Sequence, residues 1–141
     1  MNQKSFQNIN GRCQCGSIQF IVSQPAFLVE HCHCSMCRRL HGALYGSYAG
    51  VNTQHFSLKS NKDSLSIYAS SKDLDRHFCK ICGCHIFFKY KPEPENVYYC
   101  IALLNKNCHP GHNPEDEKRI FVGSKSCFHE IEDSLPKFDV R

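Results

Sequence analysis

Two short stretches, Cys13-Gln14-Cys15-Gly16 and Cys79-Lys80-Ile81-Cys82-Gly83, carry the pattern that decides the fold of this chain. Each offers two closely spaced thiols followed by a glycine, which tolerates the positive φ that a metal-binding turn requires. A structural zinc ion takes four ligands in a tetrahedron, and each stretch supplies two thiolates. We therefore predict one structural zinc that ties the first part of the chain to its middle and contributes to folding stability.

Other interpretations of the cysteines lead to different folds. The two pairs could bind separate metals or be ordinary buried thiols, but each pair alone fills only half a coordination shell. A disulfide framework is a further alternative for the 11 cysteines. The odd count, the C-x-C and C-x-x-C spacings and the lack of an apolar leader after Met1 argue against it. We expect a chain in the reducing cytoplasm, where thiols persist.

A third group of cysteines lies between the two pairs, in His31-Cys32-His33-Cys34-Ser35-Met36-Cys37-Arg38-Arg39. A short helical turn over residues 35–41, which Ser35 could cap and Gly42 could end, would let the three thiols converge on one ion. Three thiolates leave the fourth zinc position free for water, a thiol or another residue, and an open position is where zinc does chemistry. We predict a second, catalytic zinc on Cys32, Cys34 and Cys37.

The fourth ligand of this second site is left open by the sequence. Local candidates are His31, His33, His41, Cys84 and His85. Cys84 matters most, because a permanent thiolate there would make the zinc structural or regulatory. We expect an exchangeable position, since the segment that holds the three cysteines fixes no fourth ligand. His33 and His41 are also the closest candidates for a general base.

Arg38 and Arg39 directly follow the third group of cysteines. Three thiolates and Zn²⁺ carry a net charge of −1, which these arginines could offset while holding an anionic ligand such as a carboxylate. The formal net charge of the chain is only +4 and its basic residues are scattered, so the sequence does not predict a nucleic-acid-binding stripe. No apolar run approaches the roughly 18 residues of a membrane helix, and we expect no membrane partner.

The remaining sequence predicts a mainly β protein with short helical turns. Alternating or apolar runs predict strands at residues 18–22, 65–67, 86–90, 97–104 and 120–122. Turn-forming residues separate them at 60–63, 91–95 and 109–114. No window keeps a helical period over three turns. The length favours one domain that spans residues 1–141.

These motifs resemble the glutathione-dependent formaldehyde-activating (GFA) family. The three cysteine groups carry the resemblance, and it continues through Arg119-Ile120-Phe121-Val122-Gly123-Ser124-Lys125 and Leu135-Pro136-Lys137-Phe138, covering roughly residues 9–138. It implies a zinc fold of several coiled antiparallel β-sheets. It also implies a structural zinc on Cys13, Cys15, Cys79 and Cys82 and a second zinc on Cys32, Cys34 and Cys37. The family includes non-enzymatic relatives, among them centromere protein V-like proteins.

The founding activity of the family joins glutathione and formaldehyde into S-(hydroxymethyl)glutathione and is classed as a carbon–sulfur lyase activity. The resemblance therefore implies a zinc-dependent enzyme whose partners are a small thiol such as glutathione and an aldehyde such as formaldehyde. In such a mechanism zinc lowers the pKa of the substrate thiol. Two alternatives stay open: a non-catalytic zinc-binding interaction module, which a filled fourth position would favour, and a cysteine-based redox or metal sensor.

Overall fold

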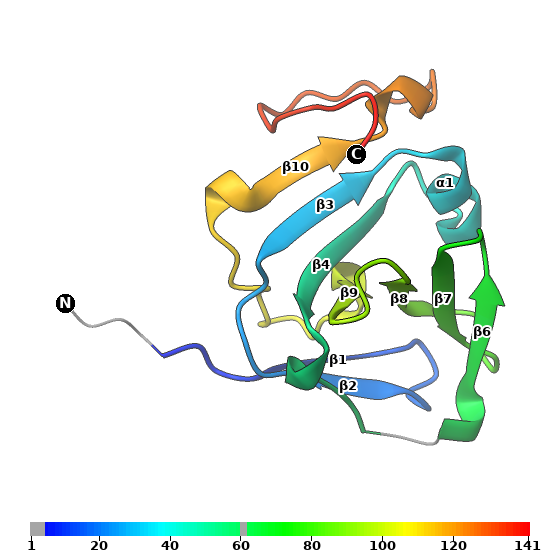
Figure 1. The fold of residues 1–141 in the computed structure, drawn as a ribbon, viewed down its shortest axis with the longest axis vertical. Helices are drawn as coiled ribbons and strands as arrows, with labels where there is room; N and C mark the ends of the chain where they lie inside the picture. Colours follow the sequence, from blue (N-terminus) through cyan, green and yellow to red (C-terminus); the bar gives the residue numbers. More distant parts are fainter. Residues whose placement is uncertain (1–4, 60–61) are drawn as a thin grey trace.

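The computed structural model describes residues 5–59 and 62–141, which form two β-sheets and one short α-helix (Figure 1). The helix is α1 (Ser35–His41), and the strands are β1 (Ile9–Arg12), β2 (Gln19–Val22), β3 (Leu28–Cys32), β4 (Gly46–Asn52), β5 (Phe56–Leu58), β6 (Leu65–Ala69), β7 (Leu74–Cys79), β8 (His85–Tyr90), β9 (Asn96–Cys100) and β10 (Glu117–Ile120). Single 3-10 turns are η1 (Thr53–His55), η2 (Lys62–Ser64), η3 (Ile101–Leu103), η4 (Pro114–Asp116) and η5 (Val122–Ser124). The mainly β class is confirmed.

Most of the predicted strands are present, with two changes at their ends. The runs at 18–22, 65–67 and 86–90 fall on β2, β6 and β8. The run at 97–104 continues as a strand only to Cys100, where η3 begins. The last run forms β10 but ends at Ile120, because Phe121 has φ 54° and cannot extend a strand. Of the predicted turn at 60–63, Ser60 and Asn61 lie outside the described residues.

The strands are arranged in a small and a large sheet. The small sheet has the order β1-β2-β5, and the large one has the order β10-β3-β4-β9-β8-β7-β6. Neighbouring strands are antiparallel, except that β10 runs parallel to β3 and pairs Ile120 with Cys32. Helix α1 follows β3 directly and lies near the ends of β3, β4 and β7 (Figure 1). This connection places the segment with three cysteines at one end of the large sheet.

The main core lies where the small sheet packs against the middle of the large one. Phe20 of β2 stacks on Phe56 of β5 with ring centroids 5.3 Å apart. Phe56 in turn meets Phe87 of β8 at 5.0 Å, and Phe20 meets Tyr99 of β9 at 5.8 Å. Burying such a ring stabilises the fold by about 1.5–3 kcal/mol. Aromatic residues of β2 and β5 therefore hold the small sheet against β8 and β9 of the large one.

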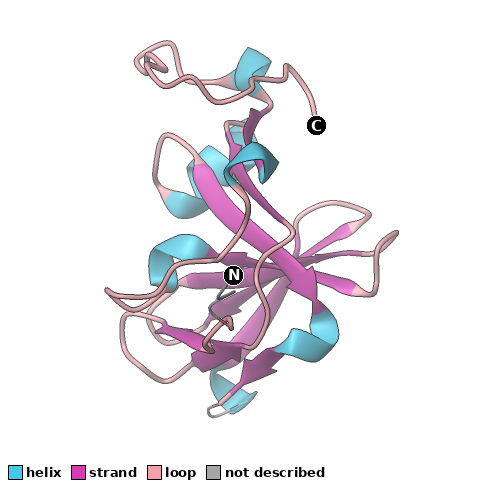
Figure 2. Cartoon of the chain, turned by 90° about the vertical axis from the view of Figure 1, so that its left-hand side faces the viewer, coloured by secondary structure: helices cyan, strands magenta, loops and turns pink. Residues whose placement is uncertain are grey.

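The segment after β10 folds back along that strand (Figure 2). The Arg119 backbone N–H donates to the Pro136 carbonyl at 2.8 Å, and the Phe138 N–H donates to the Arg119 carbonyl at 3.0 Å. Arg119 Nη2 also lies 2.6 Å from Asp133 Oδ2. These contacts bring Arg141 to the large sheet, where its Nε is 3.5 Å from Glu30 Oε1. No helix in residues 5–59 and 62–141 has the length and apolar character needed to cross a membrane.

Candidate metal centres

The first metal centre brings together Cys13, Cys15, Cys79 and Cys82, whose sulfurs all lie within 4.8 Å of one another. The Cys13 and Cys15 sulfurs are 3.6 Å apart, and those of Cys15 and Cys79 are 3.7 Å apart. A zinc tetrahedron with Zn–S bonds of about 2.3 Å has edges of about 3.8 Å, so these sulfurs already have tetrahedral spacing. The centre joins the β1–β2 turn of the small sheet to the β7–β8 turn of the large sheet.

Both turns end on a glycine with positive φ. Gly16 has φ 80° and Gly83 has φ 82°, a left-handed conformation that L side chains rarely adopt. The Gly16 N–H donates to the Cys13 carbonyl at 3.1 Å, and the Gly83 N–H donates to the Cys79 carbonyl at 2.7 Å. Although burial raises it, backbone N–H groups at Cys15 and Cys84 lower the pKa of Cys82 to about 6, while burial raises the pKa of Cys79 to about 11. The β7–β8 turn therefore favours the thiolate, the form that binds metal, at Cys82.

Cys84 lies beside this first centre and not at the second. Its sulfur accepts a hydrogen bond from the Gln14 backbone N–H at 3.3 Å, within the first cysteine turn. In the described part of the chain, Cys84 is not grouped with Cys32, Cys34 and Cys37. The sequence left open the alternative that Cys84 is the fourth ligand of the second centre. The position of Cys84 at the first centre corrects that alternative. All eleven cysteines are free thiols.

The second metal centre is formed by Cys32, Cys34 and Cys37, whose sulfurs also lie within 4.8 Å of one another. Cys32 ends β3, Cys34 precedes α1, and Cys37 lies in its first turn. The predicted turn over residues 35–41 and its end at Gly42 are confirmed, but Ser35 is not the cap. Cys34 caps the helix instead, because its backbone is extended and its sulfur accepts from the Cys37 N–H at 3.3 Å. The neighbouring thiols of Cys32 and Cys37 lower the pKa of Cys34.

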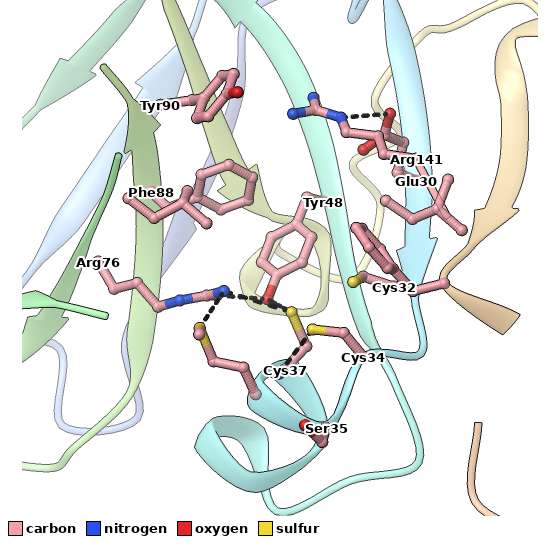
Figure 3. Close-up of a pocket in the computed structure, with 14 residues that line it drawn as sticks. Glu30, Cys32, Cys34, Ser35, Cys37, Tyr48, Arg76, Phe88, Tyr90 and Arg141 are labelled. Atoms are coloured by element: carbon pink, nitrogen blue, oxygen red, sulfur yellow. Dashed lines mark hydrogen bonds and ion pairs between the residues drawn. The ribbon is translucent and has the colours of Figure 1, made fainter. Parts of the chain in front are cut away.

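Arg76 is a buried cation beside the second centre that the sequence analysis missed. It lies on β7 with 3% of its surface exposed, and its Nη2 donates to Cys37 Sγ at 3.5 Å. Its Nη1 donates to Tyr48 Oη at 3.1 Å, and Tyr48 Oη donates to Cys37 Sγ at 3.3 Å (Figure 3). Among the described residues no carboxylate pairs with Arg76. A buried charge needs a counter-charge, and a zinc ion with three thiolates supplies −1. The three thiols and the buried cation beside them therefore fit a metal ion at this centre.

A cavity of about 450 Å³ opens onto the second centre. All three cysteines line it, together with the rings of Tyr48, Phe88, Tyr90 and Phe121. Figure 3 shows the sulfurs at one end of the cavity and the Arg141–Glu30 pair away from them. Its volume lies in the range of pockets that hold small molecules. A ligand in the cavity would reach the sulfurs directly.

The other residues singled out from the sequence are distributed around this centre. His31 is held by Ser47 and Glu117, at 2.7 and 2.8 Å, and His33 Nε2 lies 3.0 Å from Arg119 Nη1. Burial, with help from Arg119, lowers the pKa of His33 to about 4. None of the five proposed fourth ligands is grouped with the three cysteines in residues 5–59 and 62–141.

His41 is the histidine that reaches the cavity, through one intermediate side chain. Its Nε2 lies 2.6 Å from Tyr48 Oη, and Tyr48 lines the cavity. Burial first, and then charge repulsion from His85 and Arg76, lower the pKa of His41 to about 4, so the ring is neutral at neutral pH. Arg38 donates to the Ser124 carbonyl at 3.3 Å and Arg39 is exposed, so the arginines that line the cavity are Arg76 and Arg141.

The sequence of this chain was compared with models of known protein families. A family model described as glutathione-dependent formaldehyde-activating enzyme matches residues 8–124. The chain belongs to this family. The resemblance seen in the cysteine groups is thereby confirmed, and both candidate centres of this GFA-family chain fall inside the matched residues.

Curated relatives of this GFA-family chain include fungal proteins. One from Fusarium vanettenii is 28% identical over 95 residues (64% of this chain, 51% of that protein), and one from Podospora anserina is 29% identical over 103 residues (72% and 47%). Both carry the family description as a provisional name. The chain therefore spans about half the length of these two. An uncharacterized lyase of Schizosaccharomyces pombe is 33% identical over 98 residues, 68% of this chain and 67% of that protein.

A solved structure shares the fold. The crystal structure of a Rhodobacter sphaeroides protein matches the GFA-family chain with a TM-score of 0.56 at 21% sequence identity. The match covers 72% of this chain and 91% of that one. At this identity the likeness establishes the mainly β fold and no more.

Proposed function

We propose that this chain is a zinc-dependent carbon–sulfur lyase-type enzyme that makes and breaks adducts between a small thiol and an aldehyde. The observation that carries the proposal is a set of three converging cysteines, without a fourth protein ligand among the described residues, at the end of a ligand-sized cavity. Three protein ligands with an open fourth position are typical of catalytic zinc. The family description, which names glutathione and formaldehyde, supports the same type of reaction.

The two centres have different jobs in this proposal. Four thiolates on Cys13, Cys15, Cys79 and Cys82 would close a structural zinc site that clamps the two sheets together. Cys32, Cys34 and Cys37 would hold the second zinc. When bound, this zinc would lower the pKa of a thiol at its fourth position. Arg76 would balance the net charge of −1 that the three thiolates and Zn²⁺ carry together. Arg38 and Arg39 lie outside the cavity and could hold only a ligand group that extends beyond it.

The chain also provides a route for the proton. When a thiol adds to an aldehyde, sulfur bonds to the carbonyl carbon and the thiol proton must reach the carbonyl oxygen. Tyr48 Oη lies 3.3 Å from Cys37 Sγ and 2.6 Å from His41 Nε2, and His41 is neutral at neutral pH because its pKa is lowered to about 4. We assign the proton transfer to Tyr48 with His41 behind it. The pKa of Tyr48 itself is raised by burial, so its hydroxyl holds a proton.

The interaction-module and sensor alternatives have less support. The module was tied to a permanent thiolate from Cys84, and that sulfur accepts a hydrogen bond at the first centre. The sensor needs exposed, reactive thiols at the second centre, but Cys32 and Cys37 are buried and only Cys34 is partly exposed. Both observations favour the enzyme.

Exchange spectroscopy by NMR tests the proposal. A thiol, an aldehyde and their adduct are mixed at equilibrium, and the rate of interconversion is measured with and without zinc-loaded protein. We expect acceleration by the wild type and by Cys127→Ser, which changes an exposed cysteine outside both centres. Cys34→Ser should lose the acceleration. A wild-type protein with two zinc ions that leaves the rate unchanged for every thiol and aldehyde pair tried would refute the proposal.

A further inference from the structure

We infer that the thiol taken by the second centre carries a carboxylate, and that Arg141 holds this carboxylate at the end of the cavity away from the sulfurs. This inference rests on the proposed function, since it names a group on the substrate of the same site and the residue that recognises it. The thiol sulfur would occupy the open metal position at the other end. Arg141 is then a residue that determines specificity and takes no part in metal binding.

The Arg141 guanidinium lines the cavity and offers donors to a ligand. Its side chain is 32% exposed, and its ion pair with Glu30 is made through Nε, at 3.5 Å. Figure 3 shows the two terminal nitrogens on the side away from Glu30, and most of the guanidinium N–H donors belong to these nitrogens. Among the described residues no second carboxylate is ion-paired with Arg141. The planar fork of a guanidinium suits a carboxylate, which can accept two parallel hydrogen bonds from it.

The charge of Arg141 is only partly neutralised by Glu30, because Glu30 is shared with a second cation. The Glu30 side chain is 3% exposed, and its Oε1 also lies 3.6 Å from Lys118 Nζ. One buried carboxylate therefore faces two cations, and the three groups together carry a net positive charge. Arg76, the other arginine that lines the cavity, is occupied by Tyr48 and Cys37. A carboxylate that enters the cavity thus finds its available cation at Arg141.

Two aromatic rings and a returning backbone segment hold the Arg141 guanidinium in place. It lies over the rings of Tyr98 and Tyr90, 5.2 and 5.5 Å from their centroids. The segment that carries it is tied back by the Val122 N–H, which donates to the Phe138 carbonyl at 3.0 Å. A guanidinium stacked on rings keeps the donors at its edge for a ligand. Its position is fixed before the ligand arrives, which lowers the entropy cost of binding.

A polar groove of about 590 Å³ adjoins the cavity at Arg141. Glu30, Tyr90 and Arg141 line both the cavity and the groove, so Arg141 lies at their junction. The groove is also lined by Glu93, which accepts a hydrogen bond from Tyr98 Oη, and by Glu95. A thiol longer than the cavity can place a carboxylate on Arg141 and a positively charged group near these carboxylates. Thiols built from amino acids, of which the glutathione in the family description is one, carry both groups.

A matched pair of thiols tests the inference on protein loaded with Co²⁺ at both centres. Glutathione and its diethyl ester differ only in their carboxylates, which the ester masks as uncharged groups. Benzyl mercaptan, which has no carboxylate, serves as a third probe. Binding of a thiol sulfur to the metal is read from the visible absorption of cobalt. We expect wild-type protein to bind glutathione about tenfold more tightly than the diethyl ester, because the ester cannot form the charged hydrogen bonds to Arg141.

Arg141→Gln should weaken glutathione binding about tenfold and change the affinity for the diethyl ester and benzyl mercaptan by less than about twofold. Arg141→Lys keeps the charge but not the planar fork, so it should weaken glutathione binding less than Arg141→Gln does. Arg39→Gln changes an exposed arginine outside the cavity and is the control, which should leave all three affinities unaltered. Thermal melting checks that each variant is folded.

The outcomes separate the inference from the proposed function. Equal weakening of glutathione and its diethyl ester in Arg141→Gln, or an unaltered glutathione affinity in that variant, overturns the inference and leaves the proposed function standing. A loss of the same size in Arg39→Gln also overturns it, since the carboxylate would then be held outside the cavity. A cobalt spectrum that no thiol changes overturns both.

Discussion

Arg76 Nη2 lies 3.5 Å from Cys37 Sγ, so a buried guanidinium from β7 contacts a cysteine on α1 that the chain positions for a metal. In the large sheet β7, which carries Arg76, is second from one edge, and β3, which leads into α1, is second from the other. Tyr48 of β4 is hydrogen-bonded to both residues. This contact explains how a cation without a carboxylate partner is tolerated in the core. We therefore expect metal binding at the second centre to depend on Arg76.

Replacing Arg76 by methionine should weaken metal binding at the second centre by roughly a hundredfold or more, because it leaves the buried negative cluster without its counter-charge. The first centre should keep its metal. Zinc affinity measured by chelator competition should show one tight and one weakened site. Arg39→Met is the matched control, since Arg39 is an exposed arginine on α1, the helix that carries Cys37. Equal weakening in both variants would return the charge-balancing role to the arginines after Cys37.

Loss of a ligand should have different consequences at the two centres. Cys79→Ser should give unfolded or insoluble protein, because the first centre joins the two sheets and its metal contributes folding energy. Cys34→Ser should give a folded protein with one zinc. Circular dichroism, thermal melting and elemental analysis distinguish the two. Similar loss of structure in both variants would contradict the division between a structural and a catalytic centre.

Tyr48→Phe should slow adduct exchange by about a hundredfold or more, in line with the usual size of general acid–base catalysis. Zinc content should stay at the wild-type value, since Tyr48 donates to Cys37 but is not a ligand. The rate is measured by NMR exchange at saturating zinc, and Tyr68→Phe serves as the exposed control. An unchanged rate in Tyr48→Phe would remove this residue from the proton route.

Gly83→Ala should lower the free energy of unfolding by about 1–2 kcal/mol, the usual cost of a left-handed conformation for an L residue. Nothing lies within 4 Å of the added methyl group, so steric clash does not contribute. Gly83→Asn should cost less, because asparagine visits this conformation more readily. Chemical unfolding at saturating zinc measures both. Identical stability of wild type and Gly83→Ala would show that the turn can relax away from φ 82°.

The sequence predicts the cysteine groups that the structure brings together, because the spacing within each C-x-C and C-x-x-C element is a local property. Cys34 and Cys37 sit one helical turn apart, and each cysteine turn carries its own glycine. The cap was predicted at Ser35 instead of Cys34, since a thiol can accept a helix N–H as a hydroxyl does and the two neighbours compete. Strand β2 was predictable because its buried apolar residues alternate, and β8 because it is a short run rich in apolar residues, of which Ile86, Phe87 and Phe88 are all buried.

The surroundings of the second centre could not be predicted in the same way. Tyr48 and Arg76 reach it from β4 and β7, and only the strand order of the large sheet brings them together. The sequence of β7 is polar around Arg76, and Arg76 and Cys79 are the buried residues of this strand. The apolar cavity wall at Phe121 depends on the positive φ of this residue, which no sequence pattern predicts. Tertiary pairing, which is not local, decides all of these features.

The central claim is that the second centre has an exchangeable fourth position that binds a thiol, and cadmium NMR of protein loaded at both centres measures it most directly. Each bound cadmium gives its own resonance, which moves to higher frequency as sulfur replaces oxygen among its ligands. We predict one resonance typical of four sulfurs, from the first centre, and one typical of three. Added benzyl mercaptan should move only the second resonance toward the four-sulfur position, in wild type and in Cys84→Ser alike. Two four-sulfur resonances before any thiol is added, both unmoved by it, would contradict the claim.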